Sequence, residues 1–263
     1  PVVIDNKPGA AGIVAFSELR RTPPDGHTLF VADTATMCVN PLIHDNLPYD
    51  PARDLVPLTL LFRATFLILV GGESRFQSVP QLLDAARREP GRVSYASLGN
   101  GHAVHVAIET LAQAAGVRML QVPFKDASAL FTAVAAGDVD FTAFSVNTVA
   151  GLLQQKRLRA LAVASKTRIK ELPGLPTLAE AGAPDVEMRP WAGLVAVAGT
   201  PQPVLDQLQR DLVGAIEAAE VRERIATLGF ELTPSTPQQL RARAESDLAL
   251  YTLLLRDGRL TKA

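Results

Sequence analysis

The sequence predicts an α/β protein with two open sheets, each flanked by helices. Short runs rich in β-formers alternate with amphipathic helical stretches along all 263 residues, a pattern typical of a largely parallel sheet covered on both faces. About nine such runs are too many for one small core, which favours two lobes. The expected strands are Val2–Ile4, Thr28–Ala32, Leu67–Val70, Val93–Ser97, Leu120–Pro123, Val139–Phe144, Ala160–Ala164, Gly193–Val197 and Phe230–Thr233.

Helix starts can be located from capping residues and from the spacing of apolar side chains. Ser78 with Gln81 predicts a capping box ahead of Leu82–Arg88, and Thr236 with Gln239 predicts another ahead of a long C-terminal helix. A further helix follows Gly101. Its core-facing residues, at helical spacing, are Val104, Ala107, Ile108 and Leu111.

Two segments are candidates for crossings between the lobes. One is the glycine-rich bend Leu98–Gly101, and the other is Pro190–Gly193, where the chain can bend beside Trp191. If both are crossings, one lobe comprises residues 1–97 and 194–263, and the other comprises residues 98–193. A ligand cleft between the lobes is then expected, with helix N-termini directed into it.

Composition excludes several classes of function. The chain has 26 Lys and Arg against 27 Asp and Glu and no basic stripe interleaved with aromatic residues, so no nucleic-acid partner is expected. No apolar run reaches the roughly 18 residues that span a bilayer, and Pro1–Asn6 is not a signal peptide. The single cysteine, Cys38, rules out an internal disulfide and is interpreted as a small buried hydrophobe.

The bend Gly99–Asn100–Gly101 is the most informative motif. It lies between the expected strand Val93–Ser97 and a helix whose first turn carries His102 and His105. A strand that passes into a helix through glycines can direct several free backbone N–H groups at one point, where the helix dipole adds partial positive charge. The motif therefore predicts an anion site, although the same corner is also an ordinary fold element.

A series of short motifs resembles the Bug family, the extracytoplasmic solute receptors of tripartite tricarboxylate transporters. The motifs occur in the family's order along essentially the whole chain. They are residues 5–12 (DNKPGAAG), 24–29 (PDGHTL), 40–41 (NP), 47–51 (LPYDP), 95–105 (YASLGNGHAVH), 122–125 (VPFK), 158–163 (LRALAV), 172–182 (LPGLPTLAEAG) and 198–201 (AGTP).

The resemblance implies a type II periplasmic binding protein fold with two lobes. It also implies a periplasmic receptor that closes by hinge motion on a small organic acid or amino acid and delivers it to membrane transporter subunits. In this family the ligand carboxylate is held mainly by backbone amides, small polar side chains and ordered waters. We therefore expect a monomer with no catalytic residue, metal or cofactor.

Positions carried over from the family predict the ligand contacts. Ser97 and Asn100 are expected as side-chain donors and Gly101 as a backbone donor, although Ser97 could simply cap the helix and Asn100 could simply favour a left-handed turn. Thr34 is expected to contact the ligand from the first lobe, or to be an ordinary loop residue. The complete expected set is Thr34, Ser97, Gly99, Asn100, Gly101, His102, Phe144 and Ser145.

Three positions depart from the family pattern. His102 replaces the usual serine, Asp126 follows Lys125 where glycine is usual, and Phe144 replaces a polar residue. A protonated His102 would attract an anion, whereas Asp126 would repel one. Phe144 could stack on an aromatic or more apolar acid.

The sequence also begins at the second strand of the family pattern. The first strand–helix unit of the N-terminal lobe, which carries ligand contacts, is missing from it. Either this unit precedes Pro1 in a longer chain or the protein is a degenerate receptor. We favour the first alternative, because a vacant central strand position would expose unpaired backbone and apolar surface.

Other functions remain as alternatives at this stage. His102, His105 and Glu109 fall on one helical face and could ligate zinc, although no fourth ligand is evident. Cys38 paired with a histidine could form a nucleophilic enzyme site, but nothing in the sequence places the two together. A ligand-sensing domain similar to the effector half of LysR-type regulators is the runner-up, against which the absence of a helix-turn-helix segment counts.

Overall fold

The computed structural model describes residues 2–7, 9, 12–227 and 230–262, so that Pro8, Ala10 and Ala11 of the first motif lie outside the described residues. The chain forms two compact units. Unit 1 comprises Pro1–Arg63 and Trp191–Ala263, and unit 2 comprises Ala64–Pro190. The second crossing falls within the Pro190–Gly193 run. The first crossing differs from the expected bend at residue 98, because residues 64–97 contain two strands of the unit 2 sheet.

Unit 1 contains a four-stranded sheet of order β1-β8-β2-β9. All of its pairings are antiparallel, so the expected parallel arrangement is wrong for this unit. Its elements are α1 (Ile13–Leu19), β1 (Phe30–Asp33), the π-helix η2 (Ala35–Val39), α2 (Asn40–Ile43), α3 (Pro51–Asp54), β2 (Leu55–Arg63), β8 (Trp191–Val197), α8 (Gln202–Glu217), α9 (Ala219–Thr227), β9 (Glu231–Leu232) and α10 (Pro237–Arg256).

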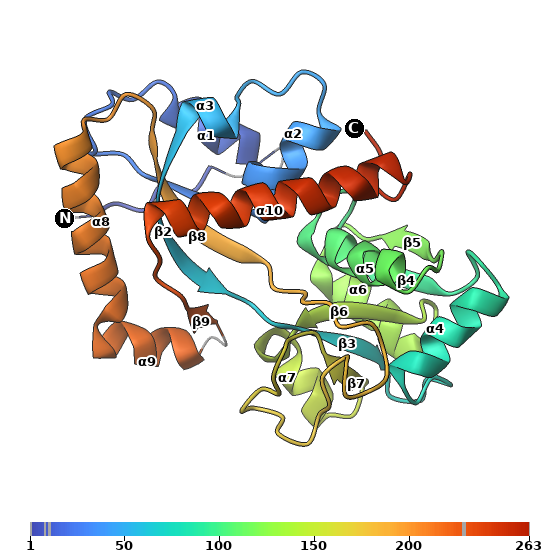
Figure 1. The fold of residues 1–263 in the computed structure, drawn as a ribbon. Coiled ribbons are helices and arrows are strands. Elements are labelled where there is room, and N and C mark those ends of the chain that lie inside the picture. The colour runs from blue at the N-terminus through green and yellow to red at the C-terminus, as the bar shows by residue number, and fades with distance from the viewer. Residues whose placement is uncertain (1, 8, 10–11, 228–229, 263) are drawn as a thin grey trace. The chain divides into compact units, whose positions relative to one another are not determined.

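Strand β2 organises the core of unit 1. The long helix α10 and helix α8 both contact it, and Figure 1 shows α10 crossing beside β2 and β8. A buried cluster of Leu58, Ala196 and Leu205 joins β2, β8 and α8. Strand β2 is not among the strands expected from the sequence, because Pro57 and two register shifts along the strand remove the two-residue alternation that identifies a half-buried strand.

Unit 2 contains a five-stranded sheet of order β5-β4-β6-β3-β7. Strand β4 is parallel to β5 and β6, whereas β3 is antiparallel to β6 and β7, so this sheet is mixed. Its elements are β3 (Phe66–Gly71), α4 (Val79–Arg88), β4 (Ser94–Ser97), α5 (Ala103–Ala114), β5 (Leu120–Pro123), α6 (Ala127–Ala136), β6 (Phe141–Ser145), α7 (Val146–Gln154) and β7 (Leu158–Val163).

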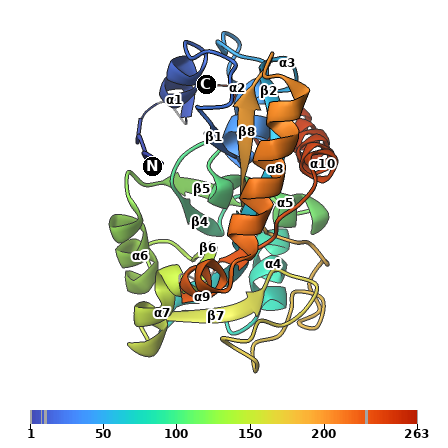
Figure 2. The same cartoon turned by 90° about the vertical axis from the view of Figure 1, so that its left-hand side faces the viewer.

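Helices cover both faces of the unit 2 sheet. The connection from β4 to β5 through α5 runs in one direction across the sheet, whereas the connections through α6 and α7 run in the other. Right-handed crossovers therefore place α5 on one face and α6 and α7 on the opposite face, as Figure 2 shows. Residues 67–70 of β3 and residue 141 of β6 are completely buried, which explains why β3 reads as a continuous apolar run.

The expected helix signals are largely confirmed. Thr236 and Gln239 form a complete capping box at the start of α10. Ser78 caps α4 by accepting from the Gln81 N–H, but the Gln81 side chain accepts from Gln77 instead of completing the box. The predicted apolar face of α5 is buried, since Val104, Ile108 and Leu111 are each 0% exposed and Ala107 is 8% exposed.

The expected strand Val2–Ile4 is not formed. These three residues have no regular secondary structure and are 91%, 83% and 78% exposed, respectively. Val31 of the edge strand β1 is also 56% exposed. Unit 1 therefore presents apolar side chains at its N-terminal segment and at one edge of its sheet.

Candidate functional site

The candidate site lies at one edge of the unit 2 sheet. Strands β4, β5 and β6 are parallel, and β7 runs in the same direction because both β6 and β7 are antiparallel to β3. The carboxyl ends of all four strands therefore meet at this edge, and α5, α6 and α7 begin directly after β4, β5 and β6. The N-termini of three helices, each with the partial positive charge of its helix dipole, therefore lie at this end of one sheet.

The glycine corner before α5 satisfies its own amides. The Gly99 N–H donates to Ser97 Oγ at 3.3 Å, and the Gly101 N–H donates to His105 Nδ1 at 3.0 Å. The His102 N–H donates to the Gly99 carbonyl at 3.3 Å. Gly99 and Gly101 have φ values of 108° and 76°, which glycine adopts without strain. The expectation that several free N–H groups converge here is therefore wrong for these three amides.

Side chains of the first turn also cap α5. His102 is the N-cap residue, and its Nδ1 accepts from the Val104 N–H at 3.2 Å. His105 is 3% exposed and its ring lies against Tyr95, with ring centroids 6.2 Å apart and an interplanar angle of 18°. The Tyr95 hydroxyl donates to Glu109 Oε1 at 2.7 Å. The predicted helical face of histidines and Glu109 thus supports the helix start and the neighbouring strand.

Ser97 and Asn100 have different environments. Ser97 is 0% exposed, and its hydroxyl oxygen accepts from Gln121 Nε2 at 2.8 Å in addition to the Gly99 amide. Asn100 is exposed at the tip of the bend. Ser97 therefore connects the loop to β5, whereas the sequence offers only a ligand contact or a helix cap for this residue. The roles of Ser97 and Asn100 as ligand donors stay predictions.

Helix α7 begins differently. Its N-cap residue Ser145 is 7% exposed and makes no side-chain cap hydrogen bond to the helix backbone. Instead, Ser145 Oγ and Thr148 Oγ1 lie 2.8 Å apart and share a hydrogen bond. Asn147 is half-buried and forms no hydrogen bond through its side chain within the described chain. The N-cap side chain of α7 therefore leaves the first-turn amides of this helix without a cap.

The third helix start carries a negative charge. Asp126 is the N-cap residue of α6 and accepts from the Ala129 N–H at 2.9 Å. Its side chain is thus committed to capping, and its neighbour Lys125 is exposed. Any anion at this edge would experience the Asp126 carboxylate as a repulsive charge.

Phe144 belongs to an aromatic cluster of unit 2. Its ring meets Phe131 edge-on with centroids 4.7 Å apart and lies 6.1 Å from Phe66. Phe144 is 8% exposed. These contacts account for its position within unit 2, and its expected stacking on a ligand stays a prediction.

Thr34 belongs to unit 1 and precedes the π-helix η2. It is 4% exposed, and its Oγ1 accepts from the Trp191 backbone N–H at 3.4 Å. The Trp191 indole donates to Asp247 Oδ2 at 2.7 Å, and Arg243 Nε donates to the same oxygen at 3.0 Å. Sequence reasoning missed this network. The signal in the sequence is Asp247, a charged residue at a position of α10 where the helical spacing otherwise places buried, mostly apolar side chains.

Cys38 is buried as expected. Its thiol is 0% exposed and donates to the Ala244 carbonyl at 3.4 Å. Burial, reinforced by the nearby charge of Asp247, raises the pKa of this thiol far above its usual range. Because the thiolate is the nucleophilic form, both the burial of Cys38 and its raised pKa argue against a nucleophilic role.

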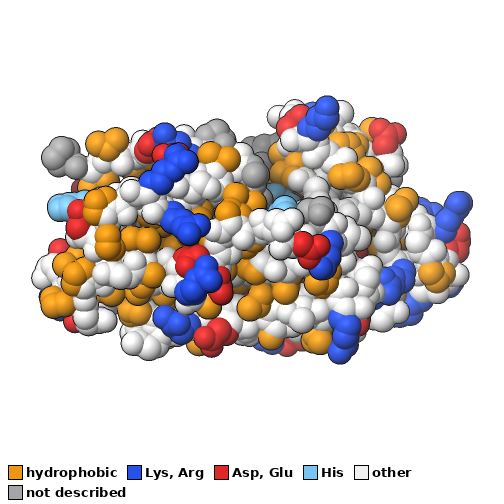
Figure 3. Space-filling view, turned by 90° about the horizontal axis from the view of Figure 1, so that it is seen from above, with side chains coloured by type: hydrophobic (Ala, Val, Ile, Leu, Met, Phe, Trp, Pro, Cys, Tyr) orange, Lys and Arg blue, Asp and Glu red, His pale blue; other side chains and the backbone are white. Residues whose placement is uncertain are grey.

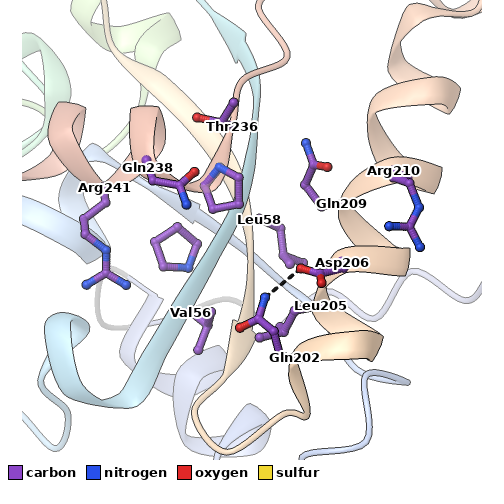
Figure 4. A pocket seen from close by; sticks show the side chains of 12 residues that line it. Val56, Leu58, Gln202, Leu205, Asp206, Gln209, Arg210, Thr236, Gln238 and Arg241 are labelled. Atoms are coloured by element: carbon purple, nitrogen blue, oxygen red, sulfur yellow. Dashed lines mark hydrogen bonds between the residues drawn. The ribbon is translucent and has the colours of Figure 1, made fainter.

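Unit 1 also has a surface groove of about 440 Å³ between β2, α8 and α10 (Figure 4). Its floor is apolar, with Val56, Leu58 and Leu205, and its rim is polar. On its α8 side, Gln202 Nε2 donates to Asp206 Oδ1, one helical turn further along, at 2.6 Å. None of the expected site residues lines this groove.

The described residues contain neither a cluster of metal-ligating side chains nor a helix that could cross a membrane. No group of three or more His, Cys, Asp or Glu side chains in this part of the chain is arranged to hold a metal ion. No helix within the described ranges is both long enough and apolar enough to cross a membrane. On the face drawn in Figure 3, basic and acidic side chains are interspersed.

Comparison with solved structures supports the fold and places it among binding proteins. The chain superimposes on a structure described as R. palustris Rpa4515 with adipate, with a TM-score of 0.84 and 27% identity over 99% of this chain and 87% of that one. The periplasmic binding protein BugD gives a TM-score of 0.80, with 26% identity over 99% and 88%. MatC from Rhodopseudomonas palustris with bound malate gives 0.76, with 25% identity over 92% and 83%. The expected α/β fold with two flanked sheets is confirmed.

Sequence comparison identifies the family. A protein of Pseudomonas sp. strain P51, described as a UPF0065 protein in the tcbD-tcbE intergenic region, is 36% identical over 98% of this chain and 77% of its own length. BugT of Bordetella pertussis is 25% identical over 98% and 79%. The family model described as tripartite tricarboxylate transporter family receptor, TctC, matches residues 1–256. The chain therefore belongs to this family of solute-binding receptors, which are not enzymes.

Proposed function

We propose that this protein captures a small organic acid at the carboxyl edge of the unit 2 sheet and delivers it to a tripartite-type transporter. The observation that carries the proposal is the start of α7, where Ser145 leaves the first-turn amides uncapped. A carboxylate accepts hydrogen bonds from such amides and is stabilised by the helix dipole. Backbone donors achieve this without the cost of burying a cationic side chain.

The ligand contacts divide between two neighbouring strand ends. Ser145 and the amides that follow it are the proposed primary donors, with Asn147 beside them. The loop Gly99–Gly101 lies next to this point, because β4 and β6 are neighbouring strands. Asn100 is a proposed secondary contact, and Thr34 stays a proposed contact from unit 1.

The class of ligand follows from the chemistry of the edge and from relatives. Adipate and malate occur in structures of two similar proteins, and both are small dicarboxylates. In this chain Phe144 lies in β6 directly before Ser145, so the strand end combines an aromatic ring with an uncapped helix. We therefore propose a carboxylate with an apolar body as the preferred ligand.

Delivery to a transporter requires an extracytoplasmic location and a change that reports ligand binding. The receptor family and the similar periplasmic binding protein BugD support the extracytoplasmic location. The chain passes between the two units at residues 63/64 and 190/191. We propose that hinge motion at these two points accompanies ligand capture. A ligand shifts this equilibrium only through its differential affinity for the two states.

A carboxylate panel tests the proposal. The protein is titrated with adipate, malate, benzoate and aspartate, by thermal shift and by calorimetry. A carboxylate present at about 100 times its Kd should raise the free energy of unfolding by about 2.7 kcal/mol. Ser145→Ala should weaken binding by about 1 kcal/mol, since it removes one hydroxyl at the anion.

Ser78→Ala is the matched control, because Ser78 caps α4 and not a helix that starts at the carboxyl edge. This change should lower stability and leave the affinity for the acid unchanged. If no acid on the panel binds to folded protein, carboxylate capture is refuted. Equal losses of affinity in the two variants would move the site away from α7.

A further inference from the structure

The start of α5 is capped by two imidazoles in an unusual arrangement. In the common capping box, the N-cap side chain accepts from the N3 amide and the N3 side chain accepts from the N-cap amide. Here the N-cap His102 accepts from Val104 at N2, and the N3 residue His105 accepts from Gly101, one residue before the N-cap. Both histidines act through Nδ1.

This geometry gives both rings the same role. A ring nitrogen that accepts a hydrogen bond from a backbone N–H carries no proton, so Nδ1 is the acceptor atom of each imidazole. The His105 ring is further held in place, because it is buried against Tyr95 and Tyr95 is hydrogen-bonded to Glu109. His105 is therefore a fixed acceptor on a rigid helix.

We infer that His105 is a positioning residue for ligand capture, acting through the Gly101 amide and not by touching the ligand. The Gly101 N–H is buried and directed at His105, so removal of this acceptor leaves a buried donor unpaired and forces the bend to rearrange. The bend Gly99–Gly101 follows β4, which pairs directly with β6, the strand that ends at Ser145. Its rearrangement would therefore disturb the edge beside Ser145.

This inference rests on the proposed function, and two substitutions separate its elements. His105→Asn places an amide oxygen close to the position of Nδ1 and keeps the acceptor. His105→Leu has a similar size but removes the acceptor. Two readouts are needed: hydrogen exchange of the Gly101 amide, measured by NMR, and the affinity for adipate and malate, measured by calorimetry.

The expected results differ between the two variants. In His105→Leu, exchange of the Gly101 amide should accelerate at least about tenfold, and affinity should fall about tenfold. In His105→Asn, both quantities should stay within about threefold of the wild-type values. Tyr95→Phe keeps the ring contact with His105 but removes the hydrogen bond to Glu109, and it should accelerate exchange of the Gly101 amide to a smaller extent. This variant replaces His105→Leu in the test if His105→Leu does not fold.

Ile108→Val is the control for general destabilisation, since Ile108 is completely buried on α5 and takes no part in the cap. It should lower stability and leave affinity unchanged. The inference is overturned if His105→Leu retains slow Gly101 exchange and normal affinity, or if Ile108→Val weakens binding equally. Absence of acid binding by the wild-type protein would refute the proposed function, whereas the exchange data would still decide whether His105 holds Gly101.

Discussion

The starts of α5 and α7 lie side by side in one sheet edge but differ in what they leave open. The α5 start follows a glycine-rich bend, yet Ser97, His102 and His105 accept hydrogen bonds from its amides. The α7 start follows no glycine, yet its N-cap serine leaves the backbone uncapped. Glycines permit an anion site, whereas the side chains that compete for the amides decide whether the site is available.

An isosteric charge change separates the two helix starts most sharply. Asn147→Asp adds a carboxylate at the α7 start and should weaken adipate or malate binding about 30-fold, through repulsion at close range. The fold should tolerate it, because an acidic residue in the first turn favours a helix. Calorimetry provides the measurement.

Asn100→Asp is the matched change at the α5 bend. We expect it to weaken binding less than about fivefold, because its charge is exposed and screened. A larger loss for Asn100→Asp than for Asn147→Asp would return the anion site to the glycine corner and reverse the comparison.

The free energy of unfolding should rank the same two helix starts in the opposite order, with the larger loss at α5. His102→Ala removes the N-cap acceptor of α5 and should lower the free energy of unfolding by about 1 kcal/mol. Ser145→Ala removes no backbone cap and should change it by less than about 0.5 kcal/mol. Urea denaturation measures both values. His102→Ser, which offers a good cap, should recover most of the loss, and failure to do so would show that His102 acts through packing.

The charge at the third start, α6, should have a smaller effect. Asp126→Asn keeps an N-cap acceptor and removes a negative charge from the carboxyl edge. Affinity for a carboxylate should rise about two- to threefold at low salt and less at high salt. Asp138→Asn changes an exposed charge beyond the other end of α6 and is the control. An equal gain in both variants would mean that only net charge matters.

The smallest effect concerns a turn in which a carboxylate and a hydroxyl accept from each other's backbone amides. Glu180 accepts from the Thr177 N–H while Thr177 Oγ1 accepts from the Glu180 N–H. The Thr177 amide first, and then Arg168, hold the pKa of Glu180 below its usual value. A lowered pKa in the folded state stabilises the protein above the unfolded value of about 4.3, and this contribution is lost as pH falls through the folded value. Melting temperature against pH should be flatter in Glu180→Gln, and superimposable curves would contradict the role.

Much of this architecture could be predicted from local patterns. The alternation of strands and helices, the caps at Ser78 and Thr236 and the buried face of α5 depend on residues close in sequence. The direction of each strand and its sheet partner depend on distant residues. For that reason the sequence assigns β3 to the first lobe, although it pairs with β6 and β7 in unit 2.

The candidate site shows the same limit on a smaller scale. The sequence locates the bend Gly99–Gly101 and the histidines that follow it. It does not show that the His105 ring turns back to accept from Gly101, because this depends on a side-chain conformation fixed by packing against Tyr95. Nor does it show that Ser145 bonds to Thr148 instead of capping α7.

The position of β8 in the sequence also sets the order in which the two units can fold during synthesis. Both β1 and β2 pair with β8, yet β8 begins at Trp191, after every residue of unit 2. During synthesis, unit 2 is complete as a continuous segment while the first part of unit 1 still lacks its central strand. The backbone N–H and C=O groups of β1 and β2 that pair with β8 therefore stay unpaired until β8 has been synthesised. During this time the two strands can bind chaperones or pair incorrectly.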